Sequence, residues 1–429
     1  MKQKISNWSN NDHVFSNLYQ PYNFTEIRKI LKSSKQIITM GSGFNYGDST
    51  FSKNIINLNN IKKKIQLNIK ENTIECSSNF LLKELLDFAE TRKLTLPILP
   101  GTANITIGGA IAADVHGKNH TSLGSFCNHI LEIQIMCSNG KIIKCNKYKY
   151  KNLFKATCGG MGLTGIILSA KIKLVPLKSK TMKIRNYFFT DYNKLVSFLI
   201  KKKSDYSVTW VDFYSIKKNK IRAVFSEGNF INDQKVTMNN SMKIPNFVLK
   251  LYFNLNFIKF FNSIYFYFNK LKKVYCKNYR NFLLPFDNFY NPKNFYGNHK
   301  IIQIQIIIKK QDLKKKLIDF LKLIEMCNLN CFLIGIKTFG KKNKNFLSFP
   351  EQGFTITADL VLDYKLKNEF KKFRNELFKQ NFKIYLTKDI LLNKKTFIKT
   401  YPNVKNFLKI KKKYDPKNKF YSSLFSRIF

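Results

Sequence analysis

Acidic residues and proline are scarce in this chain of 429 residues. Only 26 Asp and Glu stand against 75 Lys and Arg, and there are 10 prolines. With 44% hydrophobic residues and so little proline, the composition excludes a disordered or fibrous chain and predicts a folded globular one. A chain of this length is expected to form two domains, or one domain wrapped around another.

The shortage of acidic residues leaves a formal net charge of +49. Such an excess usually indicates nucleic acid or an anionic membrane surface as the partner. Here the basic residues are mostly Lys, spread among many Asn, Ile, Phe and Tyr, and no Lys/Arg block or nucleic-acid motif stands out. We therefore expect no nucleic-acid partner. Solvated lysines are the first interpretation, and a phosphate-bearing lipid surface is the second.

Long apolar runs are absent as well. The N-terminus lacks the apolar core of a signal peptide, which predicts a cytoplasmic protein, with a peripheral position at the inner membrane as a further option. The aromatic stretch 246–270 comes nearest to a membrane span, but Lys250 and Lys259 interrupt it before 18 apolar residues are reached. We expect an amphipathic helix there that lies on the protein core or on a lipid surface, with the core favoured.

The eight cysteines are scattered without a CxxC pair, so we expect reduced and mostly buried thiols. His116, His120 and His129 lie near Cys127 and raise the question of zinc. Their Gly, Lys, Asn and Ser neighbours indicate a loop, not the helix that an HxxxH site needs, and we predict no metal site.

Glycine is unevenly distributed along the chain. From residue 37 to 178 short apolar runs alternate with Gly-rich turns, whereas beyond 178 glycine is sparse and longer patterns rich in Phe, Tyr and Lys follow. This change predicts a domain boundary near residue 178. Helices are expected over 312–329 and 365–380.

Two strand patterns beyond this boundary carry polar residues at alternate positions. In Ile301–Ile308 the alternation places Gln303 and Gln305 on one strand face. In Phe354–Leu360 it places Thr355, Thr357 and Asp359 together. Amides, hydroxyls and a carboxylate on otherwise apolar strands predict two polar walls of a cavity.

The stretch Gly41–Ser49 reads GSGFNYGDS and follows the apolar strand Ile37–Met40. Glycines permit tight turns in which successive backbone N–H groups converge on a diphosphate. A Gly-rich hairpin turn is the alternative. The helix pattern that would complete a Rossmann fingerprint does not follow.

Three further motifs lie downstream. PGTANITIGGAIAADVHGKNH runs from Pro100 to His120, FKATCGGMGLTGII from Phe154 to Ile167, and IYLTKD from Ile384 to Asp389. Together these motifs resemble the vanillyl-alcohol-oxidase family of FAD-dependent oxidoreductases, and within it the decaprenylphosphoryl-ribose 2-oxidase branch. The resemblance spans nearly the whole chain and is densest over 98–172 and 381–429.

The resemblance implies an α+β fold. Residues 1–178 would form a PCMH-type FAD-binding domain of two α+β subdomains, residues 179–380 a substrate (cap) domain with an antiparallel sheet flanked by helices, and residues 381–429 a segment returning to the FAD domain. The implied reaction is oxidation of the 2-hydroxyl of a polyprenyl-phosphoryl ribose to the 2-keto form, the first half of an epimerisation toward arabinose for a cell-envelope glycan. A short-chain dehydrogenase that uses NAD(P)H is the implied partner.

Residue roles follow from the same resemblance. Those implied to bind FAD are Thr39, Met40, Gly41, Ser42, Gly43, Phe44, Asn45, Tyr46, Gly47, Asp48, Ser49, Gly101, Thr106, Ile107, Gly108, Gly109, Ala113, Asp114, Val115, His116, Ile166 and Tyr385. Those implied to bind substrate are Lys118, Gln303, Gln305, Lys337 and Lys388. Lys388 and His116 are the predicted catalytic residues, because a lysine in the YLTKD context can orient the hydroxyl and take or stabilise its charge.

Two positions depart from the family pattern. Relatives that tether FAD covalently often carry His where this chain has Phe44, and Phe cannot form that bond, so we expect non-covalent FAD. The usual Arg-Ser pair is Phe44-Asn45 here, which removes a side-chain contact to the cofactor. Thr357 replaces a Cys that reacts with certain inhibitors, a change expected to affect inhibition more than catalysis.

Two alternatives stay open at this point. A sugar, alditol or aldonolactone oxidase acting on a soluble substrate would share the FAD domain. A binding protein that keeps the fold without turnover is the other, and retention of Lys388 and His116 argues against it.

Overall fold

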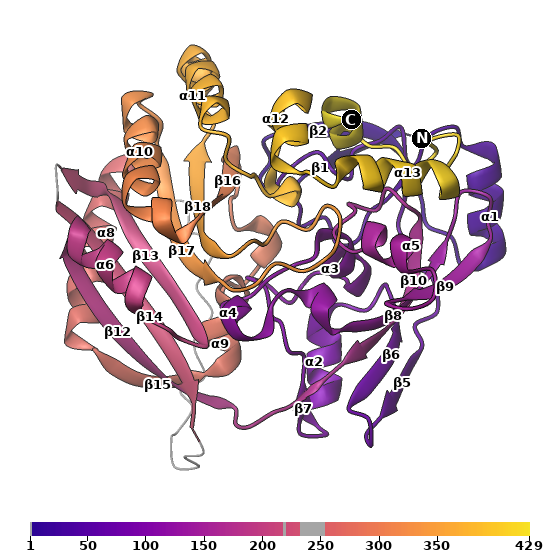
Figure 1. The fold of residues 1–429 in the computed structure, drawn as a ribbon, viewed down its shortest axis with the longest axis horizontal. Helices are drawn as coiled ribbons and strands as arrows, with labels where there is room; N and C mark the ends of the chain where they lie inside the picture. The colour runs from indigo at the N-terminus through magenta and orange to yellow at the C-terminus, as the bar shows by residue number, and fades with distance from the viewer. Residues whose placement is uncertain (1, 218–219, 232–253) are drawn as a thin grey trace.

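The computed structural model describes residues 2–217, 220–231 and 254–429 (Figure 1). Helices and sheets of mainly antiparallel strands make up an α+β protein. Three principal sheets follow one another along the chain, and the last residues return to the first sheet. The α+β class expected from the sequence is confirmed.

The first sheet has four strands and a helix beside it. Ile27 and Leu31, one helical turn apart, give the helix an apolar side that packs with Ile37 and Ile56. The strand order is β1-β2-β4-β3, with β4 parallel to both its neighbours. The elements are β1 (Lys2–Ser6), β2 (His13–Tyr19), α1 (Phe24–Ser33), β3 (Ile38–Thr39) and β4 (Asn54–Ile56).

The second sheet is antiparallel, in the order β5-β6-β10-β8-β9. Its core includes Ile133 and Ile135, which alternate along one strand, together with the apolar sides of three helices. The strands are β5 (Ile65–Asn68), β6 (Thr73–Ser77), β8 (Ile130–Met136), β9 (Ile142–Asn146) and β10 (Ile166–Lys173). The helices are α2 (Leu82–Glu90), α3 (Ile107–Ala113) and α5 (Lys151–Thr157).

The third sheet has seven antiparallel strands in the order β15-β12-β14-β13-β17-β18-β16. These are β12 (Thr181–Asp191), β13 (Tyr206–Lys217), β14 (Lys220–Phe230), β15 (Val274–Asn278), β16 (Ile301–Ile308), β17 (Cys331–Phe339) and β18 (Gly353–Val361). Its helices are α6 (Tyr192–Lys201), α8 (Leu255–Leu271), α10 (Leu313–Met326) and α11 (Lys367–Lys379). The antiparallel sheet flanked by helices agrees with the expectation.

The two faces of this sheet have different roles. On β12, Tyr187 packs against Phe198 of α6, whereas Phe188 packs against Phe266 of α8, so the two helices lie on opposite faces. Residues that pair across neighbouring strands point to the same face of a sheet. The α8 face can therefore be followed from strand to strand through the pairs Phe188–Val224, Val224–Trp210, Trp210–Gly335, Gly335–Thr357 and Thr357–Gln305. The face that carries the predicted polar residues is therefore the face on which α8 lies.

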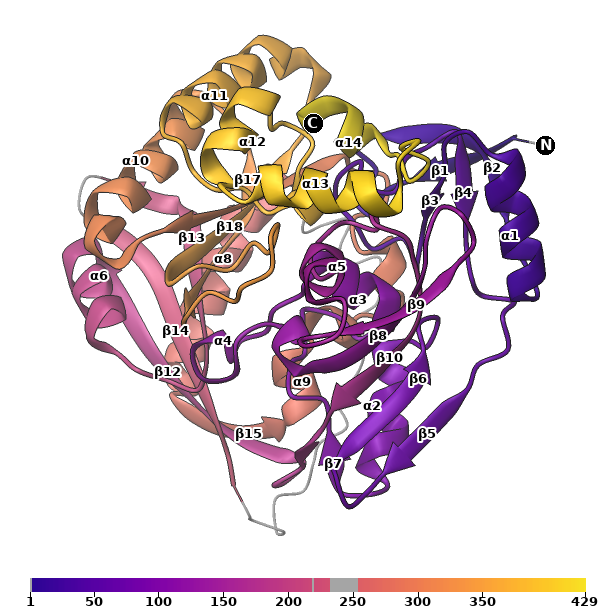
Figure 2. The ribbon, with the colours of Figure 1, turned by 45° about the vertical axis from the view of Figure 1, so that its right-hand side comes forward.

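The C-terminal segment crosses back to the first sheet. Ile37 N–H donates to Lys419 O over 2.7 Å, and Tyr421 N–H donates to Ile37 O over 2.9 Å. Figures 1 and 2 show the last helices, in yellow, beside the N-terminal elements in indigo. They are α12 (Lys394–Thr400), α13 (Val404–Tyr414) and α14 (Ser423–Ile428).

Short elements join these parts. They are β7 (Leu94–Thr95), β11 (Val175–Pro176), α4 (His120–Leu123), α9 (Tyr279–Leu283), η1 (Phe126–His129), η2 (Pro285–Asn288), η3 (Pro292–Asn294), η4 (Lys310–Asp312), η5 (Tyr364–Leu366) and η6 (Leu386–Lys388).

The helices expected over 312–329 and 365–380 are α10 and α11, each slightly shorter than predicted. The helix expected over 246–270 is α8 from Leu255 onward, and residues 246–253 lie outside the described part. Within the described ranges, none of the helices is long and apolar enough to span a membrane.

Candidate active site

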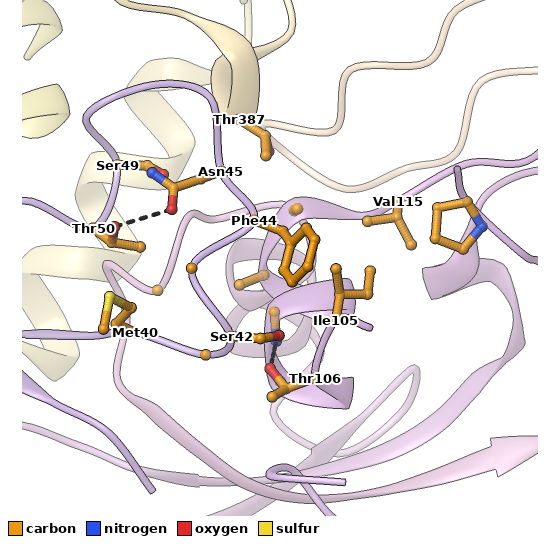
Figure 3. A pocket seen from close by; sticks show the side chains of 18 of the residues that line it. Met40, Ser42, Phe44, Asn45, Ser49, Thr50, Ile105, Thr106, Val115 and Thr387 are labelled. Carbon is orange, nitrogen blue, oxygen red and sulfur yellow. Dashed lines mark hydrogen bonds between the residues drawn. The ribbon is translucent and has the colours of Figure 1, made fainter. Parts of the chain in front are cut away.

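Segments far apart in sequence meet around one pocket. It is lined by residues 39–46, 49 and 50 of the first loop, by residues 58–59 and 78–79, by parts of the 100–116 and 161–167 segments, by residues 385, 387 and 388, and by Trp8, Phe286 and Lys337. Figure 3 shows Phe44, Ile105 and Val115 among the lining side chains. The glycine-rich motifs and the YLTKD motif thus share one cavity.

The first loop lies close to the start of α3. A Cβ atom on Gly41 would collide with the Thr106 hydroxyl, so only glycine allows this approach. The hydroxyls of Thr39 and Ser42 are buried there without a hydrogen-bond partner among the described residues. Because a buried hydroxyl normally has a partner, these atoms are suited to a polar ligand such as the FAD diphosphate.

The same loop contacts the C-terminal turn. Tyr46 N–H and Gly47 N–H both donate to Thr387 O, over 3.1 and 3.3 Å. A Cβ atom on Gly47 would collide with the backbone of Asp389, so glycine is again required. These contacts place Lys388 directly beside the first loop.

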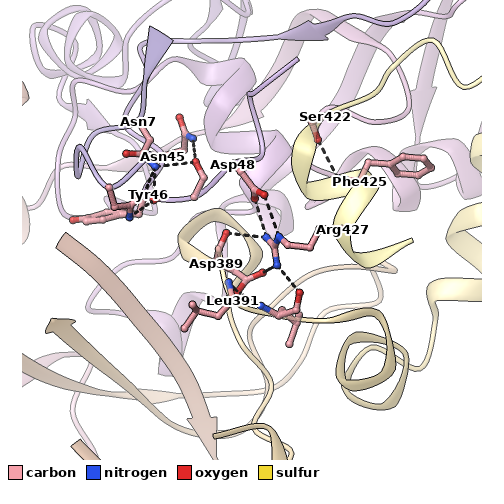
Figure 4. Close-up of polar contacts among 12 residues, drawn as sticks. Asn7, Asn45, Tyr46, Asp48, Asp389, Leu391, Ser422, Phe425 and Arg427 are labelled. Atoms are coloured by element: carbon pink, nitrogen blue, oxygen red, sulfur yellow. Dashed lines mark hydrogen bonds and ion pairs between the residues drawn. The ribbon is translucent and has the colours of Figure 1, made fainter. Parts of the chain in front are cut away.

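An ion-pair cluster outside the pocket lining holds the first loop and the C-terminal turn together (Figure 4). The Arg427 guanidinium donates to both oxygens of Asp48, over 2.8 and 3.1 Å, and to the Asp389 carboxylate over 2.9 Å. Both carboxylates are buried. Arg427 therefore ties α14 to the first loop and to the turn that carries Lys388.

The polar face of the third sheet lies next to the pocket. Lys337 on β17 pairs with Thr355, Gly335 with Thr357, and Thr357 with Gln305. A Cβ atom at Gly335 would meet nothing within 4 Å, so this part of the sheet faces open space. The two polar strand faces predicted from the sequence are thus one continuous face.

A chain of buried hydrogen bonds crosses this face. Gln303 Nε2 donates to Asp359 over 2.6 Å, Tyr296 Oη donates to the other carboxylate oxygen over 2.9 Å, and the Tyr46 and Tyr296 hydroxyls are 3.0 Å apart. Burial raises the pKa of Asp359, and the bonds from Gln303 and Tyr296 oppose that rise. This chain links the first loop to the sheet.

His116 is held as a neutral ring. Gln305 Nε2 lies 2.8 Å from His116 Nε2, and the imidazole packs against the rings of Phe339 and Tyr385 with centroids 4.8 and 5.1 Å away. Burial, with the Lys337 charge adding to it, lowers the pKa of His116 well below its ordinary value. With Nε2 accepting the amide hydrogen, the ring proton is assigned to Nδ1, which has no partner in the described part of the chain.

Two lysines of the pocket are poised between charged and neutral forms. Burial and, to a smaller extent, the nearby Lys337 charge lower the pKa of Lys388 to about 7, although the Asp359 charge acts in the opposite direction. Burial likewise lowers the pKa of Lys337 to about 8. Lys388 Nζ lies 5.3 Å from the centroid of the Tyr46 ring. A lysine whose pKa lies near neutral pH, and which lies beside polar groups and a cavity, is a candidate proton acceptor.

Most of the residues predicted from the sequence line the pocket. These are Thr39, Met40, Gly41, Ser42, Gly43, Phe44, Asn45, Tyr46, Ser49, Gly101, Thr106, Gly108, Gly109, Ala113, Val115, His116, Lys337, Tyr385 and Lys388. Their individual roles stay predictions.

Eight predicted residues lie outside the lining of this pocket: Gly47, Asp48, Ile107, Asp114, Ile166, Lys118, Gln303 and Gln305. Asp114 accepts hydrogen bonds from Cys127 N–H and Asn343 Nδ2, so its carboxylate holds a neighbouring loop. Ile166 packs in the core of the first sheet. Lys118 Nζ donates to Leu283 O over 3.1 Å, so this amine already has a backbone partner.

Sequence reasoning missed several residues at the site. Trp8 packs on Phe44 with ring centroids 4.8 Å apart, and Phe286 packs on Trp8 at 5.1 Å. Tyr296 joins Tyr46 to Asp359. None of these aromatic residues belongs to a recognisable motif, although the polar strand pattern already pointed to Asp359.

Residues 18–146 match the FAD binding domain family, and the glycine loops, with two buried hydroxyls that have no partner among the described residues, suit that cofactor. The chain is therefore an FAD-dependent oxidoreductase with a PCMH-type FAD-binding domain. The chain resembles the decaprenylphosphoryl-beta-D-ribose oxidase of Mycolicibacterium smegmatis, at 26% identity over 94% of this chain and 92% of that protein.

Sugar-lactone oxidases are similar over a shorter stretch. The D-arabinono-1,4-lactone oxidase of Debaryomyces hansenii is 26% identical over 38% of this chain and 33% of its own length. The L-gulonolactone oxidase of Scyliorhinus torazame is 24% identical over 41% of each protein. Oxidases named for a phosphoryl ribose and for sugar lactones are therefore among the relatives of this chain.

Proposed function

We propose that this chain oxidises the 2-hydroxyl of a polyprenyl-phosphoryl ribose to the 2-keto form. The observation that carries the proposal is the pocket shared by the glycine loops, His116, Lys337 and Lys388, with the polar sheet face beside it. Similarity to a decaprenylphosphoryl-beta-D-ribose oxidase along nearly the whole chain supports this substrate class. We also propose residues 1–178, 179–380 and 381–429 as FAD-binding domain, substrate domain and returning segment.

FAD supplies the acceptor for the hydride that leaves the carbinol carbon. Lys388 in its neutral form accepts the hydroxyl proton at Nζ, since its lowered pKa leaves much of the amine unprotonated near neutral pH. Asp359 lies close enough to influence the charge of Lys388. The Asp359 carboxylate favours the ammonium form of Lys388 that results from this proton transfer.

Other residues orient the substrate. Gln305 fixes the His116 ring, whose Nδ1–H has no partner in the described ranges and can donate to a sugar oxygen. Lys337 is available for the substrate phosphate, because an ammonium pairs well with phosphate oxygens. The aromatic residues Trp8, Phe44 and Phe286 form an apolar wall that excludes water from the reacting groups.

A lactone or alditol oxidase acting on a soluble sugar is the second candidate, favoured by the relatives that match the FAD domain. Anaerobic mixing of the flavoprotein with each substrate separates the two candidates. We expect polyprenyl-phosphoryl ribose to bleach the flavin band while soluble aldonolactones and alditols leave it unchanged. Bleaching by a soluble sugar alone would select the second candidate, and no bleaching by any of them would indicate a binding protein.

The 2-keto product requires a reductase to complete an epimerisation. We propose a short-chain dehydrogenase that uses NAD(P)H as the partner, acting beside this chain at the inner face of the membrane. Purified chain with substrate alone is expected to yield ketone and no arabinose epimer. Full epimerisation without an added nicotinamide enzyme would contradict this partner.

A further inference from the structure

Helix α8 presents a row of large apolar side chains to solvent. Leu271 is 84% exposed, Phe260 62%, Tyr267 59%, Phe268 55% and Ile264 48%. Their spacing of three, four and seven residues places them on one side of the helix. An apolar stripe normally faces the core, so an outward one marks an interaction surface.

The opposite side of α8 is firmly packed. Ile258, Asn262 and Phe266 are buried, and Asn262 Nδ2 donates to Asp212 over 2.9 Å. Phe266 contacts Phe188 on β12 with ring centroids 5.8 Å apart. The helix is thus oriented by its inner contacts, and the outward stripe is a fixed feature of the fold. The core-packing interpretation of this stretch accounts for its inner side only.

Positive charge surrounds the stripe. Lys259, Lys270, Lys272 and Lys273 are exposed on the helix or directly after it. The sequence contains neither Asp nor Glu between Asp233 and Asp287. Aromatic and aliphatic side chains bordered by lysines, without acidic residues, match the composition of helices that lie in the interface of an anionic bilayer.

The helix also adjoins the active site. It packs on the same sheet face as Gln305 and Thr357, as the strand register shows. Ile258 belongs to the apolar cluster that contains Trp8 and Tyr46, two residues that line the pocket. Apolar contacts therefore run without interruption from the inner side of α8 to the wall of the pocket.

We propose that the outward stripe of α8 (Phe260, Ile264, Tyr267, Phe268 and Leu271) docks on an anionic lipid bilayer. The helix lies in the plane of the interface, with its apolar side chains below the headgroups and the flanking lysines against lipid phosphates. Its benefit for catalysis rests on the proposed function: docking brings the pocket to the surface where a polyprenyl-linked sugar resides. The docking itself does not depend on which substrate is oxidised.

Vesicle flotation of the holoenzyme tests the docking. We expect the wild type to float with phosphatidylcholine vesicles that contain phosphatidylglycerol, and at least about tenfold less with phosphatidylcholine alone. Phe260→Ser/Phe268→Ser and Lys272→Glu/Lys273→Glu should each reduce flotation by about tenfold or more. Matched controls at exposed positions elsewhere, Phe15→Ser/Tyr148→Ser and Lys149→Glu/Lys151→Glu, should float like the wild type.

Three results would overturn the proposal. Wild type that stays in solution with anionic vesicles is one, and equal flotation of the α8 variants is another. The third is a wild-type dimer that the Phe260→Ser/Phe268→Ser variant dissociates without vesicles, since the stripe would then cover a second copy. Flavin bleaching by substrate in detergent reads out the proposed function separately, and loss of bleaching with intact flotation would reject that function alone.

Discussion

At the scale of single residues, Lys388 is the proposed proton acceptor. As the hydride leaves the carbinol carbon the hydroxyl becomes strongly acidic and must release its proton, so loss of a positioned proton acceptor typically costs on the order of 100-fold in rate. We expect Lys388→Ala to slow substrate-driven flavin reduction by about that factor while FAD stays bound, because the glycine loops hold the cofactor. Rapid-mixing absorbance at the flavin band measures both. A wild-type rate would remove Lys388 from the mechanism, and a colourless variant would assign it to cofactor retention.

The pH dependence of the same step has a defined sign. If the neutral amine of Lys388 accepts the proton, the reduction rate rises with pH through about 7 and then levels off. Asp359→Asn removes a negative charge that favours the ammonium form, so the midpoint should fall. Lys337→Met removes a positive charge that disfavours it, so the midpoint should rise. Rate profiles of the three proteins test this, and midpoints that move together would contradict it.

Phe44 sets the form in which FAD is held. A phenyl ring offers no atom for the covalent bond that a histidine makes at this position in some relatives, and in the structure Phe44 packs on Trp8. Acid precipitation of the purified protein should therefore leave the flavin in the supernatant. Flavin that stays in the pellet would show a covalent bond elsewhere in the site.

At the scale of elements, the C-terminal helix supports the site from outside the pocket. Arg427 pairs with the buried Asp48 and Asp389, and its removal leaves two carboxylates close together without a cation. We expect Arg427→Met to lower the free energy of unfolding by about 3 kcal/mol and to weaken FAD retention. Arg427→Lys should lose less. Thermal unfolding and flavin release on dilution measure the two effects, and an unchanged Arg427→Met protein would show that α14 is dispensable.

The strands were predictable from the sequence, whereas contacts between distant segments were not. Alternation along the strands placed Gln303, Gln305 and Asp359 on polar faces, because a strand's side-chain period is local. Trp8 and Tyr296 were missed because their roles arise from contacts between segments nearly 290 residues apart, for which the chain carries no local pattern. The Asp114 carboxylate bonds to a loop that begins more than 200 residues later, a contact that no local pattern predicts.

At the scale of the whole molecule, two segments far apart in the sequence reach the pocket: the C-terminal segment lines it, and the inner side of α8 packs against its wall. The first brings Lys388 to the first glycine loop, and the second carries the outward stripe that we propose docks on a lipid surface. Motifs predicted the FAD-binding part because backbone contacts to a cofactor require glycine at fixed spacing. The join between the polar sheet face and the first loop is a tertiary arrangement, and motif spacing alone could not give it.

The central claim is that the bond broken during flavin reduction is the C–H bond at C2 of the ribose. Rapid mixing of the holoenzyme with polyprenyl-phosphoryl ribose deuterated at C2, compared with substrate deuterated at C3, tests this claim most directly. The account predicts that flavin reduction is slowed several-fold by deuterium at C2 and is unchanged by deuterium at C3. Equal rates with both labelled substrates, or slowing by the C3 label alone, would contradict it.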